Sequence, residues 1–235
     1  MMNEISRTAS IDSVAAEQQR FMVSVYNWMT AGLALTGGMA FYVSQSETMT
    51  RIIFGNAIIP IVLVIAQIGL VIYLSAGVQK MSASQATGVF LLYAGLTGLT
   101  FSAIFMAYTT STITSAFLVT AGTFATMSFY GYTTKKDLSG WGSFLFMGLI
   151  GIVIASVVNM FMHSPALHWV VTYAGVLIFV GLTAYDTQKI KEMNIIGNEG
   201  TEEDTKEAIL GALRLYLDFI NLFLMMLRIM GGNRD

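Results

Sequence analysis

Two aspartates in otherwise apolar stretches are the residues best suited to chemistry in this chain. Asp186 lies one helical turn before Lys189, and Asp218 lies four residues after Arg214 and three before Asn221. Ionisable groups inside a long apolar segment are costly, so they are candidates for function by default. Two carboxylates in a low-dielectric site cannot both ionise cheaply, and such a pair is expected to share one proton.

A pair of this kind predicts a pH-dependent latch. With one shared proton the carboxyl groups hydrogen-bond and hold their helices together, and without it they repel. Asp186 and Asp218 also offer the oxygen ligands that Ca²⁺ prefers, but they supply far fewer than the roughly six to eight oxygens of a tight site. Weak, transient contact is what conduction requires. The alternative is purely structural, with Asp218 neutralised by Arg214 and Asp186 by Lys189.

The composition indicates that the chain that contains these acids is a membrane protein. The chain has 235 residues, of which 55% are hydrophobic and only 11% charged. Too few charges are present for a disordered chain or for an ordinary soluble enzyme. The net charge of −2 gives no basic excess for nucleic acid, and the absence of cysteine excludes disulfides and thiolate metal sites.

The gaps between charged residues predict seven transmembrane helices. Charge-free runs of 26, 28, 54 and 48 residues precede Glu47, Lys80, Lys135 and Asp186, respectively. One crossing needs about 20 apolar residues, so the runs hold one, one, two and two helices. Glu207–Arg228 makes the seventh, although it contains Arg214 and Asp218. We expect an all-α integral membrane protein with helices over 21–43, 56–78, 84–107, 113–133, 141–162, 168–190 and 207–229.

The distribution of Lys and Arg predicts the orientation. With a cytoplasmic N-terminus, eight of them lie inside, namely Arg7, Arg20, Lys80, Lys135, Lys136, Lys189, Lys191 and Lys206. Three lie outside, namely Arg51, Arg228 and Arg234. We therefore expect a cytoplasmic tail over 1–20, a membrane domain over 21–231 and a C-terminal tail, 232–235, on the opposite side.

Signals for an enzyme are poor. The sequence has no paired-His metal motif, no Gly-x-Ser-x-Gly turn and no phosphate-binding Gly-Lys-Ser/Thr loop. The segments around Asp186 and Asp218 also lack the Gly-x-Gly-Asp context of an intramembrane aspartyl protease. We expect no catalytic residues and no cofactor, with Ca²⁺ only as a permeant or weakly bound ion.

The flanks of the two aspartates nevertheless resemble a known signature. Gly181–Ile190, with Tyr185-Asp186, and Leu215–Phe223, with Leu217-Asp218-Phe219-Ile220-Asn221, are similar to motifs of the Bax inhibitor family. Tyr130–Leu138 resembles the connection between that family's fourth and fifth helices. Val25–Thr30 resembles the first helix of its bacterial inner-membrane members. The resemblance covers about 21–231.

The resemblance implies a seven-helix Bax-inhibitor-like bundle with a central last helix, placed in the bacterial inner membrane with a periplasmic C-terminus. It also implies a pH-sensitive Ca²⁺ leak gated by Asp186 and Asp218. Some relatives carry an arginine-rich end of the second helix that can bridge the acids, whereas this sequence has only Gln79-Lys80 there. Arg214 is the candidate substitute.

A second function class stays open. Members of the family are also associated with regulating other membrane machinery, including membrane proteases. The polar segment 1–20 and the acidic connection 191–206 would then be docking elements. The two interpretations share the bilayer as surroundings and differ in whether Ca²⁺ and H⁺ or a membrane protein is the partner.

Overall fold

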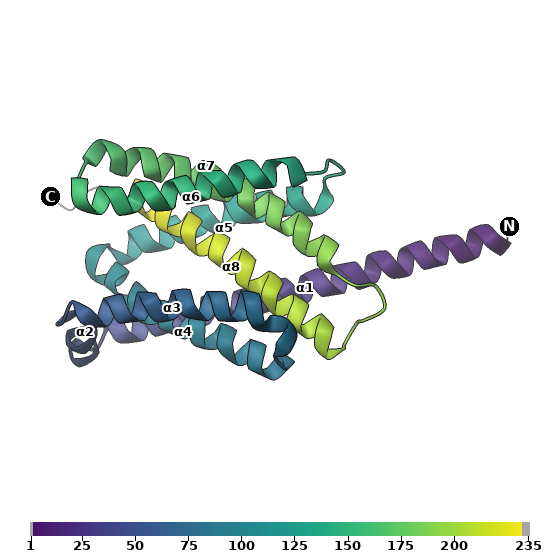
Figure 1. The fold of residues 1–235 in the computed structure, drawn as a ribbon, viewed down its shortest axis with the longest axis horizontal. Helices are drawn as coiled ribbons and strands as arrows, with labels where there is room; N and C mark the ends of the chain where they lie inside the picture. Colours follow the sequence, from purple (N-terminus) through teal and green to yellow (C-terminus); the bar gives the residue numbers. More distant parts are fainter. Residues whose placement is uncertain (1, 232–235) are drawn as a thin grey trace. The chain divides into compact units, whose positions relative to one another are not determined.

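The computed structural model describes residues 2–231, with side chains described from Ser13 onward, and no residue in that range lies in a strand (Figure 1). The expected C-terminal tail, 232–235, lies outside the described residues, as do Arg234 and the side chain of Arg7. The all-helical class expected from the sequence is confirmed. The helices are α1 (Met2–Ser44), α2 (Glu47–Phe54), α3 (Ile58–Gly77), the 3₁₀ turn η1 (Val78–Lys80), α4 (Ala83–Ala107), α5 (Thr110–Thr133), α6 (Ser139–Met162), α7 (Pro165–Met193) and α8 (Glu202–Met230).

Six of these helices are long and apolar enough to cross a membrane. They are α3 with η1, α4, α5, α6, α7 and α8. Each contains or closely matches one expected span, and the ends differ by at most five residues. The expected first span, 21–43, lies within α1, which is not among the six. A seventh crossing therefore stays a prediction.

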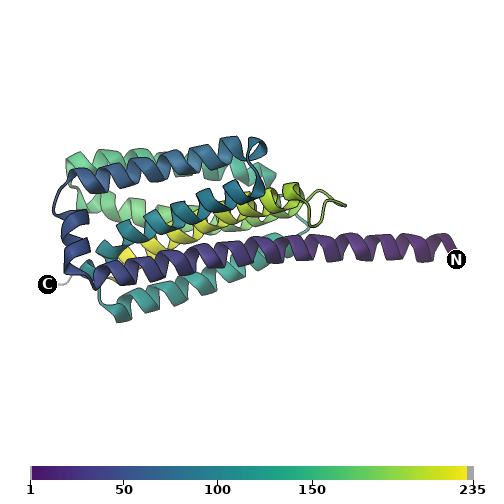
Figure 2. The same ribbon diagram turned by 90° about the horizontal axis from the view of Figure 1, so that it is seen from below.

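The N-terminal part of the chain holds two features that the charge pattern did not predict. α1 is one continuous helix from Met2 to Ser44 (Figure 2), so the expected tail and the expected first span belong to the same element. The short helix α2 follows, capped by the side chain of Ser46, which accepts a hydrogen bond from the amide of Met49. Such a cap satisfies one of the free amides of a helix start.

The chain divides into two compact units. The first comprises α1 to α4 and returns with Ile190–Arg214, which covers the end of α7 and the start of α8. In its core the Thr36 hydroxyl of α1 donates to the carbonyl oxygen of Ala94 on α4, at 2.9 Å. Gly98 allows this close approach, because a Cβ there would lie 2.6 Å from the Cβ of Met39.

The second unit contains α5, α6, most of α7 and the half of α8 that begins at Leu215. Its buried centre is a cluster from three helices, formed by Leu145 of α6, Phe179 and Leu182 of α7, and Leu222 and Met225 of α8. α8 is the most buried of the six apolar helices: 67% of its most apolar window is buried, against 6 to 33% for the others. The central place expected for the last helix stays a prediction.

Candidate functional site: the carboxylates of α7 and α8

Asp186 and Asp218 both belong to the second unit, and the packing of α7 against α8 defines their relative height. Gly175 of α7 faces Met225 of α8, since a Cβ at Gly175 would lie 2.9 Å from the Met225 Sδ. Further along α7, Leu182 joins Leu222 in the buried cluster. Residue numbers rise along one helix as they fall along the other, so the two helices are antiparallel.

That register brings the two acids to the same level. Asp186 lies four residues after Leu182, and Asp218 lies four residues before Leu222, so each is one turn beyond the buried cluster on the same side of its helix. Asp218 is buried, with 4% of its surface exposed, and Asp186 is half-buried. The two carboxylates expected to meet therefore occupy corresponding turns of packed helices.

The residues on either side of Asp186 attach α7 to the rest of the unit. Tyr185 lies against Gly142 of α6. Thr187 shares a buried hydrogen bond of 2.9 Å with Ser128 of α5. Gln188 accepts from the Leu138 amide at 2.8 Å and donates to the Lys136 carbonyl at 2.9 Å. These contacts of three residues thus set the rotation of α7 at the level of Asp186.

Phe219, the residue after Asp218, is also held by contacts with another helix. The ring of Phe219 packs edge to face with those of Phe117 and Phe124 on α5, with centroids 5.6 and 5.4 Å apart. Such aromatic pairs favour defined geometry in addition to burying area. The residue after Asp218 therefore fixes the rotation of this part of α8 against α5.

The other residues of the expected network differ in their exposure and in the contacts that they make. Arg214 is exposed, whereas Asp218, four residues later on the same helix, is buried. Lys189 is half-buried, and its charge acts on Asp137, whose pKa is lowered first by hydrogen bonds from Ser139 and further by Lys189.

Asn221 lies at a cavity in the second unit. Its side chain donates to the Leu217 carbonyl of its own helix at 2.8 Å. It also lines a cavity of about 590 Å³ between α6, α7 and α8, whose polar lining comprises Ser156, Asn159, His168, Asn221 and Arg228. Phe179 and Met225 of the buried cluster also line this cavity. The cluster therefore lies between the cavity and the level of the acids.

Sequence reasoning missed this cavity as a site. Arg228 entered only the charge count, and Asn159 was not among the candidate residues. The polar lining residues share one feature in the sequence, which is that they lie near the ends of α6, α7 and α8. This feature indicates a site only once the structure shows that those ends meet. Asn159 also stabilises the α6–α7 connection, where its side chain accepts from the Ser164 amide at 2.9 Å.

Comparison with known proteins places the chain among relatives. A family model described as "Inhibitor of apoptosis-promoting Bax1" matches residues 18–235. The chain belongs to the Bax inhibitor family. It is 55% identical to the inner membrane protein YbhL of Escherichia coli strain K12 over 234 residues, which covers 99% of this chain and 100% of that protein.

More distant relatives extend the same family. An uncharacterized protein of Borreliella burgdorferi is 45% identical over 93% of this chain and 94% of its own length. An uncharacterized membrane protein of Streptococcus pyogenes serotype M3 is 35% identical over 91% and 93%, respectively. Together with its six apolar helices, these likenesses make this family member a multi-pass inner membrane protein.

Proposed function

We propose that this protein is a pH-sensitive cation leak pathway, with Ca²⁺ as the permeant ion, gated by Asp186 and Asp218. The observation that carries the proposal is the α7–α8 register, which gives two acids corresponding turns within one compact unit. Asp218 is 4% exposed, so a second negative charge beside it would be costly. Transport rather than catalysis follows from the absence of any catalytic motif in the sequence.

The path that we infer runs through the second unit. The polar cavity forms the outer vestibule, and the cluster of Leu145, Phe179, Leu182, Leu222 and Met225 closes its inner end. Apolar constrictions of this kind block ions because water does not fill them. A shared proton holds α7 against α8 and keeps the cluster packed. Loss of that proton makes the carboxylates repel, loosens the cluster and admits the ion.

Weak binding suits this role. Among the side chains that the structure describes, residues 13–231, no group of three or more His, Cys, Asp or Glu is arranged to hold a metal ion. Two carboxylates alone retain Ca²⁺ only briefly, which allows it to leave on the other side. Ca²⁺ and H⁺ thus compete for the same pair of groups.

We further propose seven crossings, with the N-terminus cytoplasmic and the C-terminus periplasmic. Contacts in the first unit support this arrangement. Gln18 donates to the Lys191 carbonyl at 3.2 Å, so this part of α1 lies at the α7–α8 connection. The Ala83 amide donates to Glu202 at 2.7 Å, so the start of α4 lies there too. α1 then leads away from this end, and α3 leads back to it.

The seventh crossing is tested by labelling. The chain has no native cysteine, so single cysteines can be introduced at the exposed positions Ala15 and Ala57. If α1 crosses, a membrane-impermeant maleimide added to spheroplasts reacts with Ala57→Cys alone. Equal labelling of both positions in intact spheroplasts would contradict the crossing and leave six.

The conduction proposal is tested with purified protein in liposomes that enclose a Ca²⁺ dye. We expect Ca²⁺ entry to rise several-fold as pH is raised, because deprotonation opens the latch. Asp186→Asn and Asp218→Asn should each abolish the rise, since one neutral partner removes the repulsion. Asp218→Glu should restore it.

Asp137→Asn is the matched control, because this exposed carboxylate has a lowered pKa and stays ionised over the same range. It should conduct like the unchanged protein. An equal, pH-independent Ca²⁺ entry in all five proteins would overturn the proposed latch.

A regulatory role remains the second candidate, and one observation favours it. The Arg20 guanidinium pairs with Glu199, and the Gly197 amide donates to Glu17 at 2.6 Å. The N-terminal segment and the acidic connection thus form a single surface. If the purified protein conducts nothing but binds a purified membrane protease, and Arg20→Glu abolishes that binding, this interpretation replaces the first.

A further inference from the structure

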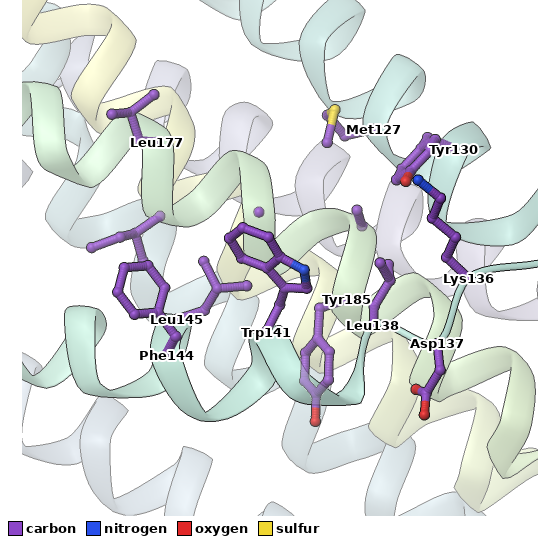
Figure 3. A pocket seen from close by; sticks show the side chains of 13 residues that line it. Met127, Tyr130, Lys136, Asp137, Leu138, Trp141, Phe144, Leu145, Leu177 and Tyr185 are labelled. Carbon is purple, nitrogen blue, oxygen red and sulfur yellow. The ribbon is translucent and has the colours of Figure 1, made fainter. Parts of the chain in front are cut away.

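A second cavity in the same unit opens among α5, α6 and α7 (Figure 3). It has a volume of about 480 Å³. Leu145 of the buried cluster lines it, whereas neither Asp186 nor Asp218 does. One end is polar, with Lys136 and Asp137 of the α5–α6 connection. The other end is apolar, with Phe144 of α6 and Leu177 of α7.

The walls of this cavity face outward. Trp141 is 62% exposed, Phe144 61% and Leu177 74%, although all three belong to helices apolar enough to span a membrane. Exposed apolar side chains on such helices contact lipid. The solvent that reaches the apolar end is therefore hydrocarbon, whereas the loop end lies at the membrane surface, where Trp and Tyr side chains gather.

The dimensions match one lipid chain. Along α7 the cavity extends from Tyr185 to Leu177, a rise of about 12 Å over eight residues. One leaflet contributes about 15 Å to the hydrocarbon core, so the cavity spans most of it. A single acyl chain laid along α7 would therefore reach from the surface to near the midplane.

The charge at the mouth selects the headgroup. Lys136 lines the mouth, its exposed neighbour Lys135 belongs to the same connection, and the charge of Lys189 acts on Asp137. The one acid, Asp137, already accepts a hydrogen bond from the Ser139 amide at 2.8 Å. With Lys135 and Lys136 against Asp137, the connection at the mouth carries a net positive charge. Basic pockets between transmembrane helices recognise anionic headgroups.

We propose that this cavity binds one anionic phospholipid, with its phosphate beside Lys136 and one acyl chain between Phe144 and Leu177. The lipid would lie against Ala184 and Tyr185, directly before Asp186 in α7. The site depends on the membrane placement of α6 and α7 and does not require that the protein conducts ions.

The test uses fluorescence quenching of Trp141 by brominated lipids. Trp28→Phe and Trp169→Phe leave Trp141 as the sole tryptophan. The protein is placed in phosphatidylcholine vesicles that carry brominated phosphatidylglycerol or brominated phosphatidylcholine. We expect the anionic lipid to bind about five-fold more tightly, the effect of one lysine near the surface.

Four further substitutions separate the headgroup contact from the chain contact. Lys136→Gln should remove the preference for phosphatidylglycerol, whereas Lys80→Gln, at another exposed lysine, should keep it. Phe144→Ala should weaken the binding of both lipids several-fold. Phe146→Ala, on the same helix and 59% exposed but outside the cavity, should not. Equal binding of both lipids by the unchanged protein, or equal effects of the two lysine substitutions, would overturn the site.

Discussion

The hydroxyl groups of Ser128 on α5 and Thr187 on α7 lie 2.9 Å apart in a buried hydrogen bond, one residue away from Asp186. Thr187 also donates to the Thr183 carbonyl of its own helix at 2.7 Å. The hydrogen bond between α5 and α7 therefore depends on the hydroxyl of Ser128, which is itself a buried residue. It holds α7 at the level where the proposed latch operates.

Removing either hydroxyl should destabilise the protein measurably. We expect Ser128→Ala and Thr187→Val each to lower the free energy of unfolding by about 1 kcal/mol, the usual net value of such a bond. The double variant should cost less than the sum of the two, because both remove the same interaction. Thermal unfolding in detergent provides the measurement. Thr126→Val, an exposed hydroxyl bonded only to its own helix, is the control.

Gln188 should control the α5–α6 connection. Its side chain satisfies the Leu138 amide and the Lys136 carbonyl together, so Gln188→Ala leaves two backbone groups without that partner. Each costs about 1–3 kcal/mol if it stays buried, so the loop should open instead. We expect faster trypsin cleavage after Lys135 and Lys136. An unchanged cleavage rate, equal to that of Gln79→Ala, would show that other contacts hold this connection.

Two glycines of α5 should respond oppositely to alanine. A Cβ at Gly131 would collide with the backbone carbonyl of Ala184 on α7, whereas a Cβ at Gly122 meets nothing within 4 Å. Gly131→Ala should therefore cost about 1–3 kcal/mol through overpacking. Gly122→Ala should be neutral or stabilise by up to about 1 kcal/mol, because it stiffens the unfolded chain. Similar melting temperatures for both variants would contradict the close packing of α5 on α7.

The contact between α1 and the α7–α8 connection should weaken in acid. The hydrogen bond and charge of Arg20 lower the pKa of Glu199 below its ordinary 4.5. A carboxyl with a lowered pKa stabilises the folded state above its ordinary pKa, and that stabilisation is lost as pH falls through the lowered value. We therefore expect the connection to separate from α1 only below the ordinary glutamate pKa.

Spin labels at Ala15→Cys and Ile196→Cys, both exposed, report this separation as a distance. The labels are unique because the chain has no cysteine of its own. The distance distribution should broaden in acid and in high salt, since the ion pair is exposed and screened. Glu199→Gln should show the broad distribution at every pH. A distribution that stays narrow in acid would mean that Glu17 and Gln18 hold the contact alone.

Much of the architecture was predictable because lipid imposes one dominant constraint. A helix that crosses hydrocarbon needs a long charge-free run, and such runs are visible in the sequence without knowledge of any contact. Six spans were confirmed on this basis. α2 was not predicted, because eight residues with charged side chains carry no such signal. The first span is ambiguous for a related reason, since its apolar run continues a polar helix without a break.

The candidate site was only partly predictable. The sequence by itself determined that Asp186 and Asp218 are acids within apolar segments and that they belong to a family signature. Only the tertiary structure decided that Asn221 lines the polar cavity with Arg228, that Lys189 acts on Asp137 and that Arg214 is exposed. Spacing along one helix defines the angle between its own residues. It does not define which neighbour each face meets, because that depends on how the helices rotate and cross when they pack.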